Sequence, residues 1–224
     1  MSLLEAVIGM VAPLTCEICQ RQGTALCEIC GHDALGALPP RCFLCQKRTV
    51  DYRTCSNCRR RAPITHVWVA SEYNPVIANV IKSFKFKRNR ALARPLARLM
   101  AAQLPYLKDA PLIVPIPTAT ERVRQRGYDH TLKLAAEVSA LTGWPLAEHL
   151  RRKGQSRQVG ARRVGRIEQL KGAFRPIRVD LLSGQPVLLI DDVVTTGATM
   201  SEAARVLKLA GAKSVSALAV AHKS

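Results

Sequence analysis

The chain has 224 residues, of which 48% are hydrophobic and 4% aromatic, and its formal net charge is +18. This length holds one full α/β domain and a small appendage, and the apolar content is sufficient for a packed core. The charge favours anionic partners such as nucleic acids, nucleotides or acidic lipid head groups, although charge that serves only solubility is the alternative.

The first fourteen residues, MSLLEAVIGMVAPL, are apolar but contain Glu5 and lack both a basic start and a cleavage site. They are too short to span a bilayer and do not read as a signal peptide, so we expect an amphipathic helix that packs on the body of the protein. No other long apolar run occurs, which excludes a membrane span. The sequence therefore predicts a soluble, cytoplasmic protein.

All cysteines lie near the amino terminus, in four pairs with CxxC spacing: Cys16/Cys19, Cys27/Cys30, Cys42/Cys45 and Cys55/Cys58. Two thiolates with this spacing bind one metal ion from a tight turn, and two such pairs complete a tetrahedral site. Disulfides are the alternative, but they need an oxidising compartment. The sequence thus predicts two structural Zn²⁺ ions in a double zinc ribbon. Either consecutive pairs share an ion, or the pairs cross.

Zinc binding supplies most of the folding free energy of so small a module. We therefore expect a first domain over residues 1–62, with an amino-terminal helix and the double zinc ribbon, and a second domain over residues 63–224. The basic cluster at 59–61 is either a solvated linker or part of a nucleic-acid surface.

Residues 63–224 alternate predicted strands and helices. Short apolar or alternating runs indicate strands at 64–72, 111–116, 186–190 and 214–221. Apolar residues at helical spacing indicate helices at 76–84, 95–104, 129–141 and 199–210. This order predicts an α/β fold, a mostly parallel sheet with helices on both faces. Ligands of such sheets bind outside the carboxyl ends of the strands.

Two segments after the strand at 111–116 carry candidate groups for a pyrophosphate. Pro117 and Thr118 end the sequence VPIPT, which is either a loop beside a leaving pyrophosphate or only a proline-stiffened turn. Arg122 and Arg126 belong to the sequence RVRQRGYDH, and their guanidinium groups can neutralise phosphates. His130 ends that segment, and we interpret it as the start of a helix rather than as a catalytic base.

The segment 151–178 contains ten basic residues and one acid. We expect it to be exposed and mobile, so that it closes over a polyanionic substrate or lies along a nucleic-acid backbone. Solvated charge without a function is the alternative. The candidate DNA-binding residues are Arg151, Arg152, Lys153, Arg157, Arg162, Arg163 and Arg166.

The segment from Val187 to Thr199, VLLIDDVVTTGAT, combines an apolar strand, two carboxylates, a threonine-rich turn and the start of a helix. We expect Asp191 and Asp192 at the carboxyl end of the strand, where they can accept hydrogen bonds from neighbouring sugar hydroxyls. The threonine hydroxyls and the amides near Gly197 can hold a phosphate at the helix start. An ordinary junction with an acidic loop is the alternative.

This segment resembles the phosphoribosyl pyrophosphate (PRPP) motif of type I phosphoribosyltransferases. The resemblance implies that Asp191 and Asp192 hold the ribose 2′- and 3′-hydroxyls as catalytic residues, and that Mg²⁺ binds with PRPP. It also implies that the turn wraps the 5′-phosphate. The implied PRPP-binding residues are Asp191, Asp192, Val193, Val194, Thr195, Thr196, Gly197, Ala198 and Thr199.

Several features together resemble the ComF family over essentially the whole chain: the zinc knuckles, VPIPT, RQRGY, the GAF sequence at 172–174 and the PRPP motif. The resemblance implies a type I phosphoribosyltransferase-like (Rossmann-like) sheet and a role in natural transformation or in the use of external DNA. It further implies single-stranded DNA and DNA-uptake machinery proteins as partners. Family members commonly read RGFNQ where this chain reads RGYDH, so no role is carried over to residues 128–130.

Three functions stay open. The chain is an active phosphoribosyltransferase, or a non-catalytic single-stranded-DNA-binding protein that PRPP regulates, or a nucleobase-salvage enzyme. The intact motif favours PRPP binding, and the charge favours a nucleic-acid partner. A nucleotide-sensing transcription factor is disfavoured because no helix-turn-helix signature occurs.

Overall fold

The computed structural model describes residues 13–34, 38–153 and 172–223. Most of the amino-terminal helix expected at 1–14 lies outside these ranges. Within them, no helix combines the length and the hydropathy that crossing a bilayer needs. The helices and strands are α2 (Glu28–Ala34), α3 (Ser56–Arg59), β1 (Val67–Glu72), α4 (Pro75–Phe86), η1 (Arg90–Leu92), α5 (Ala93–Ala101), β2 (Leu112–Pro115), α6 (Thr120–Arg126), α7 (His130–Thr142), β3 (Leu150–Arg152), β4 (Phe174–Pro176), η2 (Val179–Leu182), β5 (Pro186–Val194), α9 (Ala198–Leu209) and β6 (Ser214–His222).

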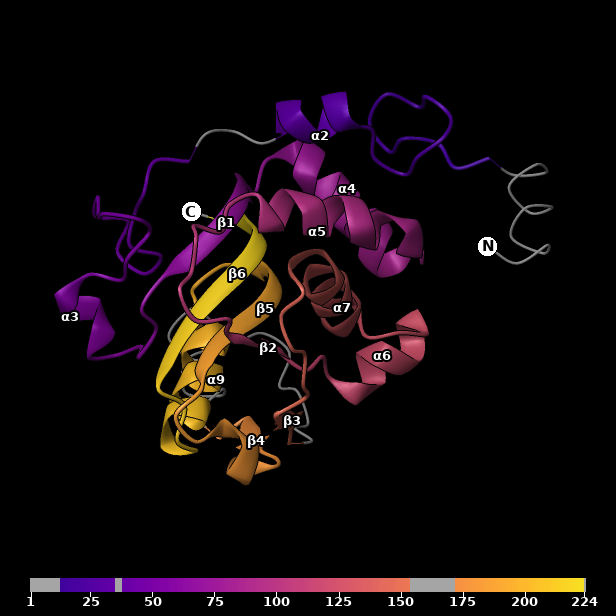
Figure 1. Ribbon diagram of the computed structural model, residues 1–224. Helices are drawn as coiled ribbons and strands as arrows, with labels where there is room; N and C mark the ends of the chain where they lie inside the picture. Colours follow the sequence, from indigo (N-terminus) through magenta and orange to yellow (C-terminus); the bar gives the residue numbers. More distant parts are fainter. Residues whose placement is uncertain (1–12, 35–37, 154–171, 224) are drawn as a thin grey trace, which may run out of the picture.

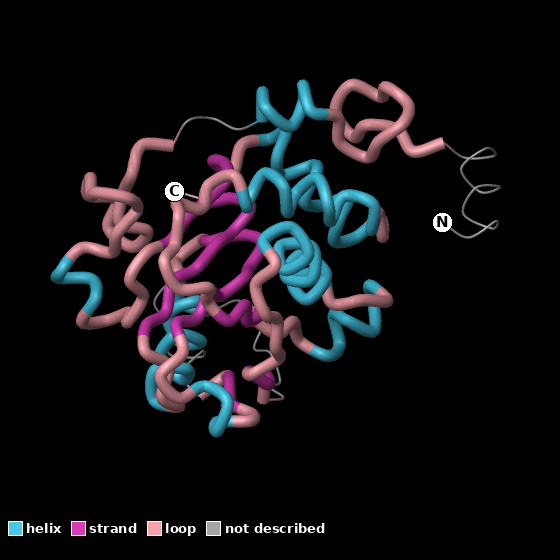
Figure 2. Tube along the Cα trace, viewed as in Figure 1, coloured by secondary structure: helices cyan, strands magenta, loops and turns pink. Residues whose placement is uncertain are grey.

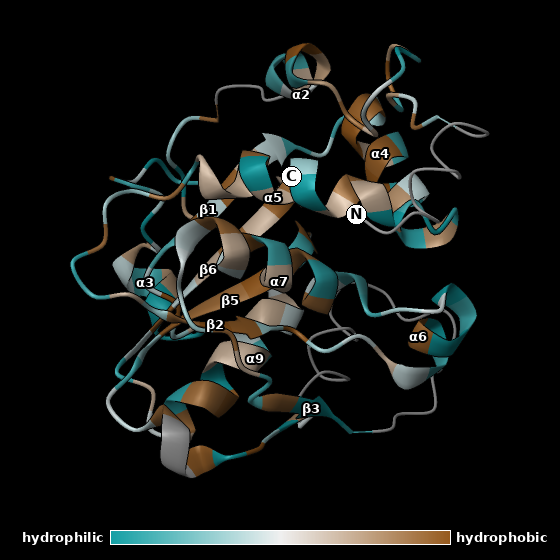
Figure 3. Cartoon of the chain, turned by 45° about the vertical axis from the view of Figure 1, so that its right-hand side comes forward, coloured by the Kyte–Doolittle hydropathy of each residue, from teal (hydrophilic) through white to brown (hydrophobic). Residues whose placement is uncertain are grey.

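Four parallel strands form the main sheet in the order β1-β6-β5-β2 (Figure 1). Most side chains of β5 and β6 are buried, as parallel strands covered on both faces require. Figure 3 accordingly shows the central strand β5 in the colour of hydrophobic residues, whereas α6 is largely hydrophilic. The expected α/β fold with a mostly parallel sheet is confirmed. Strands β3 and β4 form a separate antiparallel pair.

Helices cover both faces of this sheet (Figures 1 and 2). On one face, α4, α5 and α7 pack in a core where Phe84 and Leu134 accompany Leu188 of β5. On the other face, α9 packs in a second core where Leu207 accompanies Leu189 of β5. Neighbouring residues of β5 serve different cores because successive side chains of a strand point to opposite faces.

Local signals set the helix ends close to their expected positions. Asn74 accepts a hydrogen bond of 2.9 Å from a first-turn amide of α4, and Pro75 occupies the first helical position. Asp129 caps α7 by accepting from the amide of Thr131 at 3.0 Å. Gly143, with φ 73°, ends the same helix in the left-handed conformation.

One expectation about local structure was wrong, and one element was not predicted. Strand β5 does not end at Ile190, because Val193 and Val194 continue its pairing with β6, and the two acids therefore lie inside the strand. The segment that contains Arg122 forms helix α6, which was not predicted and which ends at Gly127 with φ 79°. This segment has few apolar residues, so no hydrophobic periodicity indicated a helix.

The two cysteine-bearing segments lie on different sides of the sheet (Figure 1). The first includes α2 and packs on α5, so that Leu26 and Ala34 share a core with Leu96. The second includes α3 and belongs to the α9 side, where Phe43 and Ile64 are buried. Both segments are mostly loop (Figure 2). Their positions therefore depend on packing against the sheet and on the cysteine clusters themselves.

Candidate functional site

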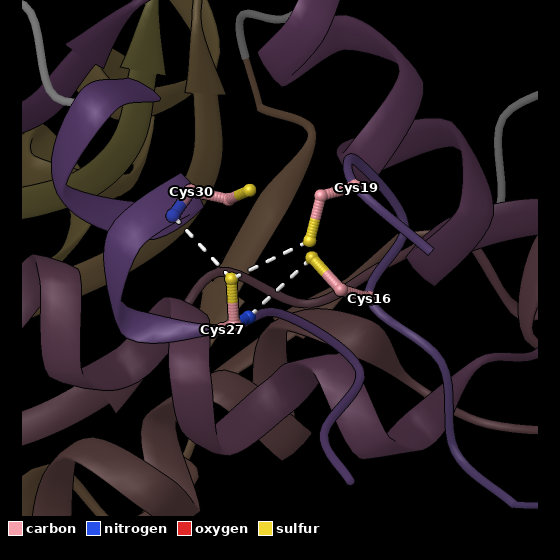
Figure 4. A group of neighbouring side chains, drawn as sticks. All are labelled: Cys16, Cys19, Cys27 and Cys30. Atoms are coloured by element: carbon pink, nitrogen blue, oxygen red, sulfur yellow. Dashed lines mark hydrogen bonds between the residues drawn. The ribbon is translucent and has the colours of Figure 1, made fainter. Parts of the chain in front are cut away.

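The fold brings the cysteines together in two sets of four. The Sγ atoms of Cys16, Cys19, Cys27 and Cys30 lie within 4.8 Å of one another, as do those of Cys42, Cys45, Cys55 and Cys58; Figure 4 shows the first set. Tetrahedral Zn–S bonds of about 2.3 Å place sulfur atoms about 3.8 Å apart. The Cys19–Cys27 and Cys45–Cys55 sulfur distances are both 3.7 Å. Consecutive pairs thus share a site, and the donor sets fit two zinc ions.

The first cysteine of each set is prepared to be a thiolate. Burial raises the pKa of Cys16, but hydrogen bonds from the backbone amides of Cys19, Cys27 and Ile18 outweigh burial and lower it to about 6. The same balance lowers the pKa of Cys42 to about 7. Zinc binds the thiolate form. Four sulfur ligands leave no open coordination position, which defines structural rather than catalytic sites.

The segment that joins β5 to α9 forms a small hollow at the carboxyl edge of the sheet. Asp191, Gly197 and Thr199 line this hollow, whose volume is about 20 Å³. The N-cap residue of α9, Gly197, has no side chain to cap the helix, and the Thr196 hydroxyl accepts from the amide of Ala198 at 3.4 Å. The start of α9, with the positive end of its dipole, therefore faces this hollow as a place for an anion.

Gly197 brings this turn into contact with the second cysteine segment. Its φ of 69° lies in the left-handed region, where glycine is favoured. A Cβ atom at this position would lie only 2.4 Å from Cε2 of Phe43. Phe43 stands between the zinc-site cysteines Cys42 and Cys45 and is 4% exposed. The absence of a side chain at Gly197 thus lets a zinc knuckle pack directly on the turn.

Asp192 points to the opposite face of the sheet and enters a buried cluster of charged groups. Its Oδ2 forms an ion pair with Nζ of Lys85 on α4 and lies 3.6 Å from Nε2 of His130 on α7. Burial, together with the positive charges of Lys85 and Arg126, lowers the pKa of His130 to about 3, so its imidazole is neutral. Burial also lowers the pKa of Lys85 to about 8, although the Asp191 carboxylate opposes this shift.

A hydrogen-bonded network joins the loop after β2 to this cluster. The amide and the hydroxyl of Thr118 donate to the Asp129 carboxylate at 3.1 and 2.9 Å. Arg126 Nη1 donates to Nδ1 of His130 at 2.9 Å. Because Nδ1 accepts, the neutral ring carries its proton on Nε2, which faces Asp192. Thr118 and Arg126, both predicted from the sequence, therefore lie in one network beside Asp192.

The charges around the two carboxylates are mostly positive. Burial raises the pKa of Asp191 to about 7, against the positive charges of Lys85 and Arg152, which lower it. Arg122 lowers the pKa of Lys85, and Arg126 does the same. Four cations from α4, α6 and β3 therefore act on these groups. This excess of positive charge suits a ligand that carries several phosphates.

The structure gathers some of the predicted residues and separates others. Pro117 and Thr118 directly follow β2, whereas Arg122 and Arg126 lie on α6. Arg152 acts on Asp191, but its neighbours on the chain, Arg151 and Lys153, are exposed. The remaining DNA-binding candidates lie outside the described residues; these are Arg157, Arg162, Arg163 and Arg166.

Two residues of the site were missed at the level of sequence. Lys85 is one of several basic residues near the end of a helix, and only the packing of α4 selects it as the partner of Asp192. Phe43 stands inside a zinc knuckle, and its contact with Gly197 spans most of the chain. A large aromatic residue inside a CxxC pair was the one available signal, since such a residue needs a place to be buried.

Comparison with known proteins defines the class of this site. Residues 93–224 match the family model described as phosphoribosyl transferase domain, so the chain belongs to that family. It is 29% identical over 213 residues to the DNA utilization protein YhgH of Salmonella typhimurium, which covers 89% of this chain and 86% of the relative. It is also 28% identical over 187 residues to competence protein F of Haemophilus influenzae, with coverages of 79% and 82%.

A more distant relative is competence protein ComFC of Streptococcus pneumoniae. It is 24% identical over 196 residues, which cover 86% of this chain and 85% of the relative. The matches to these competence and DNA utilization proteins extend over most of the chain. The resemblance to the ComF family that the motifs indicated is therefore confirmed.

Proposed function

We propose that the chain binds PRPP with Mg²⁺ at the segment from Asp191 to Thr199 and takes part in the uptake or use of external DNA. The carrying observation is the position of the Asp191 carboxylate beside the first turn of α9. One short segment thereby offers an acceptor for hydroxyls and a site for an anion, which matches a ribose 5′-phosphate. Membership in the phosphoribosyl transferase domain family supports the same ligand.

In this proposal the two carboxylates have separate tasks. Asp191 accepts a hydrogen bond from a ribose hydroxyl in the hollow beside Gly197. Asp192, on the other face of β5, holds Lys85 in position for a phosphate. Arg126 and Arg152, with Lys85, stabilise the negative charge of the ligand in a site that is largely withdrawn from water. Magnesium, when it accompanies PRPP, supplies further neutralisation of the pyrophosphate.

The DNA part of the proposal depends on charge and on the relatives. Exposed basic residues are present on the second cysteine segment, at 59–61, and at Arg151 and Lys153. Such residues contact phosphates without regard to base sequence, which suits single-stranded DNA and the names of the relatives. We also propose a cytoplasmic location, because cysteines that bind zinc as thiolates suit a reducing compartment. DNA-uptake machinery proteins complete the proposed set of partners.

The PRPP site is tested by calorimetric titration of the full chain with PRPP and Mg²⁺. Asp191→Asn combined with Asp192→Asn removes the carboxylate that accepts from the hydroxyl and the carboxylate that holds Lys85, and each charge-assisted hydrogen bond contributes about 1.5–3 kcal/mol. We expect the affinity to fall by about a hundredfold or more. Asp33→Asn combined with Asp109→Asn is the matched control, because these carboxylates are 75% and 62% exposed. Unchanged PRPP affinity in the first double variant would refute the site.

Turnover is a separate question that pyrophosphate release answers. The full chain is incubated with PRPP, Mg²⁺ and a panel of free bases and DNA fragments. Release that requires one particular acceptor identifies a phosphoribosyltransferase and names its substrate. Binding of PRPP without release under any condition, together with DNA binding that PRPP alters, identifies the regulated DNA-binding protein. A salvage enzyme would release pyrophosphate with a free base and would bind DNA weakly.

A further inference from the structure

The first CxxC turns of the two cysteine sets, at 16–19 and 42–45, have the same backbone. The amide of Gln20 donates to the Cys16 carbonyl at 2.9 Å, and the amide of Gln46 donates to the Cys42 carbonyl at the same distance. Gln20 and Gln46 both adopt the left-handed conformation, with φ 60° and 61°. The residues between the cysteines differ: they are Glu17 and Ile18 in the first turn, and Phe43 and Leu44 in the second. Two equal turns therefore present different side chains to the rest of the protein.

The side chains of the second turn cover Gly197, the residue before α9. A Cβ atom on Gly197 would overlap the Phe43 ring and lie 3.1 Å from Cδ2 of Leu44. Phe43 also shares a core with Val194 and Met200, which precede and follow Gly197 along the chain. Both of these residues line the hollow beside α9. The second turn therefore belongs to the same packed unit as the proposed PRPP site.

The backbone of Phe43 is fastened beside the same site. Nε2 of His222 donates to the Phe43 carbonyl at 3.2 Å. His222 is the last residue of β6 and pairs with Val194, the last residue of β5. The amide of Lys223 donates to the Val194 carbonyl at 2.8 Å, which continues this connection. The position of Phe43 is thus set by the cysteine turn on one side and by the strand ends on the other.

The turn before α9 gains an external support from this contact. Gly197 adopts φ 69°, and glycine loses more backbone freedom on ordering than any other residue. The Gly197 carbonyl accepts from the amide of Ser201 at 2.8 Å and from its hydroxyl at 2.7 Å, which fixes the side of the turn that joins α9. The Phe43 ring restrains the same glycine from outside the helix. A turn that is already held in its binding conformation binds more tightly, because less ordering is left to the binding step.

We propose that Phe43 is a positioning residue for the turn before α9, and that it couples zinc binding at the second cysteine set to PRPP binding. Phe43 acts through Gly197 rather than on the ligand. With its cysteines joined by zinc, the second turn keeps Phe43 on Gly197; without zinc this loop segment loosens, and the turn before α9 loses its support. Coupling between two binding sites is reciprocal, so PRPP must in turn strengthen zinc binding at the second set. The inference rests on the proposed function, since it assigns a regulation of that site.

The first experiment follows zinc release from the full, zinc-loaded chain. A chromogenic chelator takes up the zinc in the presence of Mg²⁺, with and without saturating PRPP. Alkylation of the freed cysteines, read by mass spectrometry, assigns the release to one of the two sets. We expect PRPP to slow release from the second set by about tenfold, since couplings between sites are commonly about 5–150-fold. Equal rates at 42–58 with and without PRPP, in a chain that binds PRPP, would overturn the coupling.

The second experiment changes the side chain that carries the coupling. Phe43→Ala should abolish the protection of the second set and lower the PRPP affinity in calorimetry by about tenfold. A content of two zinc ions per chain verifies that the cysteine sets are intact in this variant. Phe43→Met keeps most of the side-chain volume and should restore most of both effects. Ile18→Ala is the matched control, because this side chain of the first turn packs against the other core and should affect neither.

A double variant separates a direct contact from general destabilisation. In Gly197→Ala the new Cβ overlaps the Phe43 ring, so we expect Phe43→Ala to recover part of the PRPP affinity that Gly197→Ala loses. A merely structural role predicts instead that the two losses add, and additive losses would overturn the inference. A wild type that binds no PRPP contradicts the proposed function and the inference with it. PRPP binding without protection of the second set contradicts the inference alone.

Discussion

Two adjacent carboxylates in this chain have different surroundings because they point to opposite faces of one strand. Asp191 lies at the small hollow before α9, whereas Asp192 forms a buried ion pair with Lys85 and faces the neutral ring of His130. A buried charge must be paired or must lose its charge. Asp192 is paired with Lys85, whereas burial raises the pKa of Asp191 to about 7 against the positive charges of Lys85 and Arg152.

The raised pKa of Asp191 predicts that PRPP binding depends on pH. The pKa of Asp191 is raised from its ordinary value of 3.8 to about 7, so between these pH values the folded, ligand-free chain keeps the carboxyl protonated more than the unfolded chain does. The stability that the protonated carboxyl contributes is lost as the pH rises through about 7. Hydroxyl binding uses the ionised form. We expect the PRPP affinity to rise by about tenfold between about pH 6 and about pH 8, as the ionised fraction increases.

Titration calorimetry across this pH range, in buffers with different ionisation enthalpies, measures both the affinity and the proton released on binding. The phosphates of PRPP also titrate near pH 6 and contribute to the pH dependence of the affinity. Asp191→Asn is the control, because the contribution of the phosphates persists in that variant. If the wild type and Asp191→Asn show the same dependence on pH, the carboxyl of Asp191 does not titrate in the binding step.

Gly197→Ala is expected to affect both stability and PRPP binding. The left-handed conformation costs an L residue about 1–2 kcal/mol, and the new Cβ would lie 2.4 Å from the Phe43 ring. We expect urea denaturation to show a loss of about 2–3 kcal/mol, together with weaker PRPP binding. Gly143→Ala is the matched control, since φ there is 73° and no atom lies within 4 Å of the new Cβ. Gly143→Ala should lose only the stability that the left-handed backbone conformation costs, and it should keep PRPP binding. Equal losses of stability in the two variants would contradict this explanation.

At the scale of elements, the two cysteine segments support opposite faces of one site. Glu17 of the first segment accepts hydrogen bonds from Ser83 at 2.6 Å and from Asn89 at 2.8 Å, which fastens it to the end of α4 that carries Lys85. The second segment packs Phe43 on the turn before α9. The first zinc site therefore stabilises α4, which carries the Lys85 partner of Asp192. The second zinc site stabilises the turn that follows Asp191.

Substitution of one zinc ligand at a time should separate the effects of the two cysteine segments. Cys19→Ser and Cys45→Ser each remove one exposed ligand, and each should reduce the zinc content from two ions to one per chain. We expect faster amide hydrogen exchange in α4 for Cys19→Ser, and in β1 and the first turn of α9 for Cys45→Ser, because each change frees a different neighbour. Metal analysis and hydrogen exchange with mass spectrometry measure both effects. Identical exchange patterns in the two variants would show that the segments do not act separately.

At the scale of the whole molecule, the net charge of +18 exceeds what the proposed PRPP site uses. Four cations act near Asp191 and Asp192, and the other basic residues are spread over the cysteine segments, the helices and the region of β3. Exposed basic residues attract polyanions over distances comparable with the Debye length, about 8–10 Å in physiological salt. This charge therefore supports a polymer of phosphates as a partner in addition to a single nucleotide.

The binding of single-stranded DNA is expected to weaken steeply with salt. Each neutralised phosphate contributes about −0.7 to the slope of log affinity against log salt concentration. Arg151→Gln with Lys153→Gln should make the slope less steep by roughly 1.4 if both residues contact phosphates. Arg98→Gln with Lys108→Gln, also exposed, is the control with the same change in charge. Fluorescence anisotropy over a salt series measures the slopes; DNA binding that salt does not weaken would exclude this mode of recognition.

The sequence alone determined the features that short-range chemistry carries. Hydrophobic periodicity and capping residues such as Asn74 and Asp129 placed the main helices and the parallel strands, because these signals act within a few residues. The CxxC spacing indicated zinc, and the segment from Asp191 to Thr199 indicated the phosphoribosyl transferase domain family. Helix α6 and the antiparallel pair of β3 and β4 were not foreseen, since such short elements depend on their neighbours and not on their own pattern.

Only the tertiary structure decided which distant residues meet. The consecutive sharing of cysteine pairs, the ion pair of Asp192 with Lys85 and the contact of Phe43 with Gly197 join residues with no local relation in the chain. The alternation of side chains along β5 sent Asp191 and Asp192 to different faces, and this followed only once the strand was seen to run to Val194. Packing of the helices and zinc knuckles on the sheet sets these contacts, because burial pairs charges and fills space across the whole fold.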